Sequence, residues 1–271
     1  MSLPLTVCII ACNEEWDLPR CLKSVAFADD VVVVVDERSS DRTEAIAREA
    51  GARVFTQAYV GNIEQKNFAL DQGRCDWVLA LDADEAVSSG LRDAICAALA
   101  QGDAADGYEL DRLTFHLGRW IRHGDFHPDW QLRLFRREGG RWAGTNPHGR
   151  VRVEGRVKRL PGELEHYSYR DLADQVARIQ DFSRIQARAL HAEGRRARVS
   201  DWLLRPPARF LRGYLLKAGF RDGFPGFAIA AASAFHVFLK YATLWELERR
   251  GDAGVPASGK AARVQPVDPA A

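Results

Sequence analysis

The sequence predicts an α/β protein: a mostly parallel sheet with helices on both faces, followed by a C-terminal helical appendage. The first observation is that short apolar, β-branched runs alternate with helical patterns over the first hundred residues, which is typical of parallel sheets. The second is the run of five consecutive valines at 31–35, because a strand without polar positions is buried on both faces. The third is the apolar run 77–81, which leads directly into acidic residues. We therefore expect a covered sheet with a functional edge.

The first hundred residues divide into four predicted strands and four predicted helices. The strands are expected at 5–11, 31–35, 53–56 and 77–81, and the helices at 18–25, 43–50, 63–73 and 88–99. Polar side chains follow three of the strands, namely Asn13 with Glu14, then Asp36, then Asp82 with Asp84. Because the carboxyl ends of parallel strands meet at one edge of the sheet, we expect these side chains to form one site.

The acidic cluster Asp82-Ala83-Asp84-Glu85 is the strongest single candidate for chemistry. Hard divalent cations prefer oxygen ligands, and Mg²⁺ is usually held by one or two carboxylates together with substrate phosphates. Two carboxylates one residue apart at a strand end suit that role. The simpler interpretation is a solvated acidic turn.

The net charge of +1 hides an uneven distribution. Residues 1–110 hold 9 Lys and Arg against 20 Asp and Glu, whereas the rest is basic. A basic rear half suits phosphates, nucleic acid or a membrane surface. Its arginines are spread over several elements without a helix-turn-helix or zinc pattern, so no nucleic-acid partner is expected. Five cysteines without a C-x-x-C pair, and an N-terminus without a signal-peptide pattern, predict a cytosolic protein with reduced thiols.

Four motifs in the first hundred residues together resemble the family 2 glycosyltransferases, which bind nucleotide sugars and have the Rossmann-related GT-A fold. They are the Ala-Cys-Asn-Glu run at 11–14, the turn 36–43, Gln65-Lys66-Asn67 and Asp82-Ala83-Asp84. The later stretches 129–136 and 165–169 are similar to the small non-processive subgroup that includes the lipopolysaccharide core β-glucosyltransferases. The processive signature Gln-x-x-Arg-Trp is missing after Gln131, which favours transfer of a single sugar.

The resemblance implies a donor site and a metal at the strand ends. Asp84 would be the main protein ligand of Mg²⁺ or Mn²⁺, and His166 a further ligand. Simpler roles stay open for several of the residues that the resemblance implies. Asp36 could be a helix-start residue, Lys66 a surface lysine and His166 a core histidine. Arg133 and Arg136 could each be a solvated strand residue. The implied donor-binding residues are Asn13, Glu14, Asp36, Lys66, Asp82, Arg133 and Arg136.

The second half would supply the catalytic base and the acceptor site. Strands are expected at 107–117 and 131–136, with a loop rich in aromatic and charged residues between them. Inverting transfer needs a base for the attacking hydroxyl, and Asp129 is the predicted base because the family places a carboxylate just before this strand. The usual Glu-Asp signature is missing, and Asp125 and His127 are rivals. Trp142 and His148 are the predicted acceptor-binding residues.

The rear of the chain is predicted to be helical and to contact a membrane. A long helix is expected at 172–193, and a basic amphipathic helix around 209–221 is typical of a membrane interface. The apolar run 226–239 is shorter than the ~20 residues of a spanning helix and is interpreted as buried or re-entrant. The predicted regions are 1–105 (nucleotide-sugar half), 106–170 (acceptor and catalytic half), 171–250 (helical membrane-interface region) and 251–271 (disordered tail).

The predicted function is therefore an inverting, non-processive, metal-dependent hexosyltransferase. Its expected partners are a nucleotide diphosphate sugar, with UDP-glucose favoured by the resemblance, a lipopolysaccharide core or other lipid-linked acceptor, and an anionic membrane. Its expected place is the inner face of the cytoplasmic membrane. One alternative is a nucleotidyltransferase acting on a sugar phosphate, although no glycine-rich loop follows the first strand. Another is a non-catalytic, membrane-associated scaffold that binds nucleotide.

Overall fold

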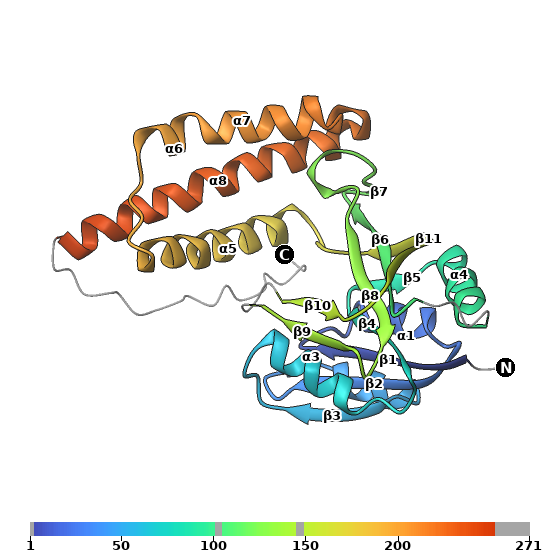
Figure 1. The fold of residues 1–271 in the computed structure, drawn as a ribbon. Helices are drawn as coiled ribbons and strands as arrows, with labels where there is room; N and C mark the ends of the chain where they lie inside the picture. The colour runs from blue at the N-terminus through green and yellow to red at the C-terminus, as the bar shows by residue number, and fades with distance from the viewer. Residues whose placement is uncertain (1–2, 101–104, 145–148, 253–271) are drawn as a thin grey trace, which may run out of the picture. The chain divides into compact units, whose positions relative to one another are not determined.

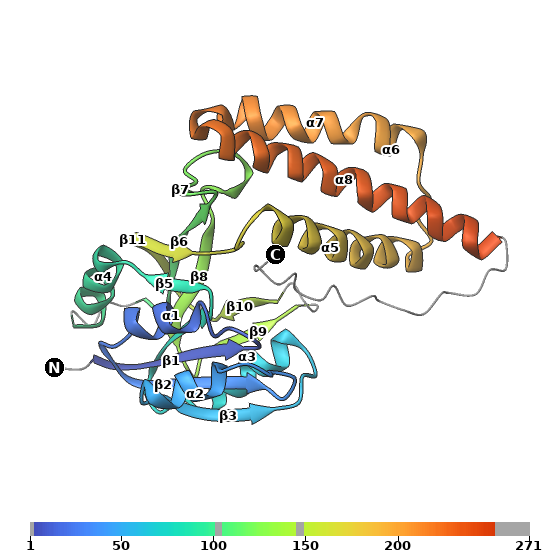
Figure 2. The same cartoon turned by 180° about the vertical axis from the view of Figure 1, so that it is seen from behind.

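A computed structural model describes residues 3–100, 105–144 and 149–252 of the chain. The chain divides into two compact units (Figures 1 and 2). The first unit comprises residues 1–175 and 212–230, and the second comprises residues 176–211 and 231–271. We describe each unit separately, and the candidate site lies in the first.

The first unit is built on a mixed sheet with the order β3-β2-β1-β4-β8-β6-β11-β5, to which β7 adds beside β6. Strands β3, β2, β1 and β4 all run parallel, as predicted. β8 is antiparallel to both of its neighbours, and β11 is parallel to β6. The strands are β1 (Leu3–Ala11), β2 (Ala28–Asp36), β3 (Arg53–Gln57), β4 (Trp77–Asp82), β5 (Glu85–Val87), β6 (Gly107–His116), β7 (Arg119–Trp120), β8 (Trp130–Arg136) and β11 (Val157–His166).

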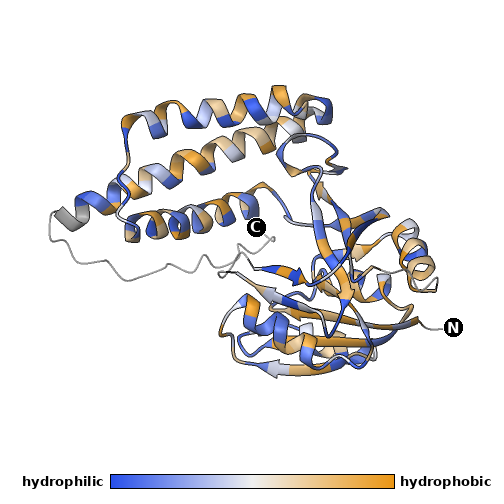
Figure 3. Ribbon diagram, in the orientation of Figure 1, coloured by the Kyte–Doolittle hydropathy of each residue, from blue (hydrophilic) through white to orange (hydrophobic). Residues whose placement is uncertain are grey.

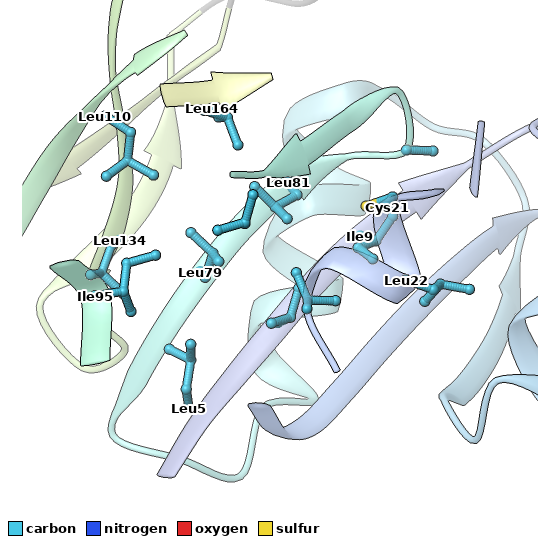
Figure 4. Close-up of a cluster of buried hydrophobic side chains, with 14 of the residues drawn as sticks. Leu5, Ile9, Cys21, Leu22, Leu79, Leu81, Ile95, Leu110, Leu134 and Leu164 are labelled. Carbon is cyan, nitrogen blue, oxygen red and sulfur yellow. The ribbon is translucent and has the colours of Figure 1, made fainter. Parts of the chain in front are cut away.

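Helices cover both faces of the parallel part of the sheet. Figure 2 shows α1 (Leu18–Ser24) and α2 (Thr43–Glu49) in front of the sheet, and Figure 1 shows α3 (Asn62–Asp71) in front of the opposite face. On the first face, α4 (Ser89–Ala100) joins α1 and α2 in burying the larger core, part of which Figure 4 shows. On the second face, α3 packs with the hairpin β9 (Gly140–Ala143) and β10 (Arg150–Val153).

The valine strand shows why both faces must be covered. Val33 and Val35 of β2 belong to the larger core, whereas Val32 and Val34 belong to the core beneath α3. Successive side chains of a strand point to opposite faces, so an apolar residue at every position needs an apolar layer on each side. All five cysteines are free thiols.

Residues 212–230 return to the first unit after the helical unit has begun. They form a π-helical turn, η2 (Arg212–Leu216), then a 3-10 turn, η3 (Gly219–Asp222), and then the start of α8 (Gly223–Asp252). Ala218, between the two turns, has a left-handed backbone with φ of 56°. The amphipathic helix predicted around 209–221 is therefore interrupted rather than continuous.

The second unit is helical. It contains most of α5 (Leu172–Ala192), α6 (Val199–Leu203), α7 (Arg205–Leu211) and the rest of α8. Its small apolar cluster centres on Ala187, Tyr241 and Leu244. Figure 3 shows hydrophobic residues along much of α8.

The expectation for the apolar run of the rear half needs correction. The apolar run 226–239 is not a short helix, because α8 continues to Asp252 through His236 and Lys240. His236 does not end the helix, since its ring contacts the side chains of Ser183 and Gln186 of α5. Within the described residues, one helical stretch, Gly219–Arg249, has the length and composition to cross a membrane, and most of its apolar window is not buried. The predicted disordered tail lies outside the described residues from 253 onward.

Candidate functional site

The polar strand ends meet at one edge of the sheet, as the sequence predicted. Asp82, the last residue of β4, lies opposite Ile10 of β1. Asn13 follows β1 with a left-handed backbone, φ 58°, and its Oδ1 accepts a hydrogen bond of 2.8 Å from the backbone N–H of Ser40 after β2. The N–H of Glu14 donates to Thr43 Oγ1 at 2.7 Å. The turns after β1 and β2 are thus tied together next to the end of β4.

Asp36, at the end of β2, is buried and fully engaged. Arg38 donates to its carboxylate from the side chain at 2.5 Å and from the backbone N–H at 2.9 Å. These hydrogen bonds hold the pKa of Asp36 below its ordinary value. Arg38 itself is exposed, and its guanidinium lies 4.4 Å from the centre of the Tyr59 ring. A ligand that reaches the Asp36 carboxylate must therefore displace the exposed guanidinium of Arg38.

A continuous row of alternating charges runs from α3 across the sheet to the loop before β8. Lys66 Nζ lies 2.5 Å from Asp82 Oδ1, and Arg133 Nη2 lies 2.7 Å from Asp82 Oδ2. The same Arg133 nitrogen lies 2.7 Å from Glu85 Oε1. Arg112 then joins Glu85, at 3.3 Å, to Asp129 Oδ2, at 2.6 Å. We call these six residues, Lys66, Asp82, Glu85, Arg112, Asp129 and Arg133, the charge row.

Glu85 is the fixed centre of the charge row. Its side chain is fully buried, and besides the two arginines it accepts a hydrogen bond from the backbone N–H of Asp82 at 2.9 Å. A buried carboxylate is tolerated only when its oxygens are paired and hydrogen-bonded. Glu85 therefore holds two arginines at once, Arg112 and Arg133.

Electrostatic pairing fixes the protonation states at the donor end of the row. Burial alone would raise the pKa of Asp82, but Lys66 and Arg133 outweigh burial and hold that pKa well below its ordinary value. Burial alone would lower the pKa of Arg133, but Glu85 and Asp82 reverse the effect and raise it. The carboxylate therefore stays ionised and the guanidinium stays protonated through the physiological range.

Trp142 of β9 forms the floor beneath the two donor-side cations. Lys66 Nζ lies 4.3 Å from the centre of its ring, and the Arg133 guanidinium lies 5.5 Å from it. Asn67 holds the tryptophan backbone through two hydrogen bonds of 3.0 Å. The indole is 7% exposed, so the structure places Trp142 beneath the predicted donor-binding residues. His148, its predicted partner in acceptor binding, lies outside the described residues.

Asp84 and His166 come together at the end of β11. His166 Nε2 lies 3.4 Å from Asp84 Oδ2, while Nδ1 lies 2.7 Å from Ser168 Oγ. The backbone N–H of Tyr167 donates to the carbonyl of Asp84 at 2.9 Å, which fixes the two segments. Strand β11 was not predicted, so no geometric reason for this pairing was available from the sequence.

The Asp84–His166 pair fits a divalent cation that keeps other ligands. It offers one carboxylate oxygen and one imidazole nitrogen, and both side chains are partly exposed. Among residues 3–100, 105–144 and 149–252 no group of three or more His, Cys, Asp or Glu side chains is arranged to hold a metal. Mg²⁺ and Mn²⁺ sites commonly complete their shell with waters and substrate phosphates. The donor set therefore suits a metal held jointly with a diphosphate.

A pocket of about 260 Å³ opens between His166 and the far end of the charge row. Asp129 stands at its wall, where Arg112 and Gln131 hold its carboxylate at 2.6 Å and 2.5 Å. The full lining is Arg112, Thr114, Asp125, Phe126, Pro128, Asp129, His166, Ser168 and Tyr169. The pocket thus joins the predicted base to the predicted metal ligand.

The two rival bases are held by other partners, although Asp125 also lines the pocket. The side chain of Asp125 is about 3% exposed and lies 3.1 Å from Lys217 Nζ. His127 Nε2 lies 3.2 Å from Asp111 Oδ2 and does not line the pocket. Of the three candidates, Asp129 combines a place in the pocket with a direct link to the charge row.

Arg136 is not brought to the site. It pairs with Trp77, the first residue of β4, and its guanidinium lies 4.7 Å from the centre of the Trp77 ring. Asp82 is five residues further along β4, a distance of about 16 Å at the rise of a strand. The antiparallel direction of β8 explains the difference, because it brings Arg133 toward Asp82 and carries Arg136 away.

Arg112 is the main residue that sequence reasoning missed. It lies on β6, and its backbone N–H donates to the carbonyl of Asp129 at 2.9 Å. Its role depends on the pairing of β6 with β8, and nothing in the local sequence around Arg112 announces that register.

Comparison with known proteins supplies an independent view of this geometry. Residues 6–153 match the profile of the family described as Glycosyl transferase family 2. The chain is 30% identical, over 90% of its length and 93% of the relative, to the lipopolysaccharide core biosynthesis glycosyltransferase LpsC of Rhizobium meliloti (strain 1021). It is 31% identical, over 88% and 86%, to an uncharacterized glycosyltransferase of Rickettsia typhi (strain ATCC VR-144 / Wilmington).

Among solved structures, the fold is similar to the mannosyltransferase PcManGT from Pyrobaculum calidifontis, determined in complex with GDP-Man and Mn²⁺. The TM-score is 0.51, with 16% identity, and the similarity covers 91% of this chain and 88% of that one. At this identity the similarity concerns the fold alone.

Proposed function

The chain belongs to glycosyltransferase family 2, and on that premise we propose that it is an inverting, non-processive, metal-dependent hexosyltransferase acting on a lipid-linked glycan. The observation that carries the proposal is the charge row. It connects cations at the nucleotide-binding edge to a carboxylate in a separate pocket, with the Asp84–His166 pair beside that pocket. Such an arrangement suits a reaction in which the donor releases an anionic leaving group while the acceptor hydroxyl loses a proton.

The donor side binds a nucleoside diphosphate. Asn13, Glu14 and Asp36 are the proposed contacts to base and ribose, because their strand ends converge beside Asp82. Lys66 and Arg133 are the proposed diphosphate contacts. Asp82 already pairs with both cations. A diphosphate therefore has to compete with this carboxylate for Lys66 and Arg133, and its higher negative charge favours it in that competition.

Asp84 and His166 would hold a Mg²⁺ or Mn²⁺ ion beside the diphosphate. When bound, the metal stabilises the negative charge that the leaving nucleoside diphosphate develops. The residues of the chain prepare its place: Ser168 Oγ lies 2.7 Å from Nδ1 and 3.2 Å from Nε2 of His166, and Nε2 lies 3.4 Å from Asp84 Oδ2. A hydrogen bond to the imidazole from outside the metal site helps to fix the orientation of a metal-ligating histidine.

Asp129 is the proposed general base. Its carboxylate accepts hydrogen bonds from Arg112 and Gln131 at the pocket wall. These contacts fix the carboxylate for a hydroxyl that enters the pocket. Proton acceptance by Asp129 as the hydroxyl attacks the anomeric carbon, opposite the leaving group, accounts for inversion.

The acceptor is proposed to be a lipopolysaccharide core or another lipid-linked glycan. This choice rests on the lipopolysaccharide core biosynthesis for which the Rhizobium relative is named and on the basic rear half of the chain. UDP-glucose is the proposed donor, and the inner face of the cytoplasmic membrane is the proposed place of action. There the enzyme and a membrane-anchored acceptor would be confined to one surface.

The test is transfer of labelled sugar from a panel of nucleotide sugars, with Mn²⁺ or Mg²⁺, onto a lipid A–core acceptor in vesicles. We expect one donor to label the lipid, with release of the nucleoside diphosphate and the opposite anomeric configuration in the product. A nucleotidyltransferase would instead release pyrophosphate from a nucleoside triphosphate and a sugar phosphate, which a parallel assay with those two substrates detects. Retention of configuration, or tight nucleotide binding without any turnover, would contradict the proposal.

A further inference from the structure

Residues 212–227 of the first unit expose an unusual amount of apolar surface. Five side chains are between 45% and 84% exposed, and they are Leu215, Leu216, Phe220, Phe224 and Phe227. Two of them lie against Tyr214, whose ring is 6.3 Å from Phe220 and 5.7 Å from Phe227, and all five fall within residues 215–227. We call this set the 212–227 surface. Contiguous apolar patches of this kind mark sites that contact a partner or a membrane.

The exposed charges on the 212–227 surface are all positive. Arg212, Lys217 and Arg221 are exposed. The only acid in this stretch, Asp222, is 1% exposed and turned inward. Its carboxylate accepts the backbone N–H groups of Arg122 and His123 at 3.0 Å and 2.8 Å. Large apolar side chains ringed by cations complement an anionic lipid interface, where the apolar groups enter the acyl boundary and the cations meet the headgroups.

The same segment is fastened to the loop that forms one wall of the pocket. Besides the Asp222 contacts, the N–H of Gly124 donates to the carbonyl of Lys217 at 2.9 Å, and Lys217 Nζ lies 3.1 Å from Asp125. Asp125 and the adjacent Phe126 line the pocket that holds Asp129. Contacts from 212–227 to this loop therefore involve the buried carboxylate of Asp222, an ion pair between the exposed Lys217 and the buried Asp125, and the backbone.

Glycines make the approach of the segment to the loop possible. A Cβ on Gly213 would meet Asp125 Oδ2 at 2.9 Å, and a Cβ on Gly226 would meet the carbonyl oxygen of Gly219 at 1.9 Å. The turns η2 and η3 and the start of α8 thus pack against each other without side chains between them. Such close packing favours a rigid unit over a floppy tether.

We propose that the 212–227 surface binds an anionic bilayer and presents the acceptor pocket to it. The first part, lipid binding, stands on the surface alone. The second part rests on the proposed function, since it assigns the pocket behind the surface to a membrane-anchored acceptor. The surface then holds the protein on the bilayer so that the glycan of a membrane-anchored acceptor enters the pocket.

The test of lipid binding is vesicle flotation of the full chain at low salt. We expect wild type to bind vesicles containing phosphatidylglycerol at least tenfold more strongly than phosphatidylcholine vesicles. The double variant Leu216→Glu/Phe224→Glu should bind the anionic vesicles at least tenfold more weakly. The matched control, Val60→Glu/Val157→Glu, changes two exposed valines elsewhere in the same unit and should stay within twofold of wild type.

A second variant tests the role of charge. Arg212→Glu/Arg221→Glu should abolish the preference for anionic vesicles. Flotation of Leu216→Glu/Phe224→Glu at the wild-type level, or an equal loss in the valine control, would overturn the proposal that the 212–227 surface binds lipid. Equal binding of wild type to both vesicle types would overturn the proposed preference of this surface for anionic lipid.

Two readouts separate this inference from the proposed function. The melting temperature shift caused by a nucleoside diphosphate with Mn²⁺ should be the same in wild type and Leu216→Glu/Phe224→Glu. If neither protein shows the shift, the proposed donor site is wrong, and the flotation assay still tests lipid binding by the 212–227 surface. The variant should also lose transfer to an acceptor in vesicles at least tenfold while keeping transfer to the acceptor dispersed in detergent. Equal losses in both formats would overturn the link between the surface and the pocket.

Discussion

The guanidinium of Arg112 holds the carboxylate of Asp129, with Nη2 2.6 Å and Nε 2.8 Å from the same oxygen, Oδ2. The remaining nitrogen of Arg112, Nη1, reaches Glu85 at 3.3 Å. One side chain therefore links the fixed centre of the charge row to the proposed base. Arg112 therefore orients the proposed base but does not itself accept the proton.

Arg112→Lys should lower kcat about tenfold and leave the KM for the donor within twofold. A lysine keeps the charge, but a single ammonium does not reproduce a planar fork that spans two carboxylates. Steady-state kinetics against donor concentration measure the effect. An unchanged kcat would show that Asp129 needs no such support, and a large rise in donor KM alone would move Arg112 to the donor site.

Asp129→Asn should lower kcat by about 10²–10⁴, the usual contribution of a general base. The nucleotide should still raise the melting temperature, since Asp129 lies at the acceptor end of the charge row. His127→Gln is the informative companion, because His127 pairs with Asp111 outside the pocket lining. If His127→Gln loses more activity than Asp129→Asn, the base has been assigned to the wrong residue.

Asp84→Asn and His166→Gln should both weaken Mn²⁺-dependent binding of a nucleoside diphosphate by at least tenfold. Each change removes one of the two donors that lie 3.4 Å apart. Binding measured by calorimetry with EDTA in place of Mn²⁺ should be similar in wild type and both variants. A defect that persists without metal would point to folding or direct nucleotide contact.

Asp82→Asn should destabilise the protein at neutral pH more than at acidic pH. The folded pKa of Asp82 lies well below its ordinary value because of Lys66 and Arg133, so the folded protein binds the proton less readily than the unfolded chain. The stabilising contribution is therefore complete above the unfolded pKa of about 3.9 and is lost as the pH falls through the folded pKa.

The corresponding measurement is the melting temperature of both proteins from pH 7 downward. The gap between wild type and Asp82→Asn should be widest at neutral pH and should close as the pH falls below about 4. A gap that is independent of pH would mean that Asp82 acts through packing rather than through its charge.

The parallel half of the fold was predictable because its signals are local. Continuous apolar runs such as 31–35 identify buried strands, and the polar residues after them, from Asn13 to Asp84, follow from where parallel strands end. The resemblance to family 2 glycosyltransferases is confirmed by the family match over 6–153. Lys66 and Asp82, predicted from separate motifs, lie 2.5 Å apart.

The antiparallel half was less predictable because its geometry is non-local. Strand β11 carries charged residues and a proline, so its sequence lacks the period of a strand, and its pairing decides that His166 meets Asp84. Arg133 and Arg136 are equivalent in the sequence, yet the register of β8 brings the first to Asp82 and leaves the second at Trp77. The length of α8 was underestimated because His236 and Lys240 look like interruptions, although both are compatible with a helix.

The most direct test of the central claim is a calorimetric titration of UDP into the full chain in the presence of Mn²⁺, with Asp84→Asn as the comparison. The account predicts binding to wild type that weakens at least tenfold in the variant and on replacing Mn²⁺ with EDTA. Absence of binding for UDP and for the other nucleoside diphosphates, or binding that is indifferent to both Asp84 and metal, would contradict it.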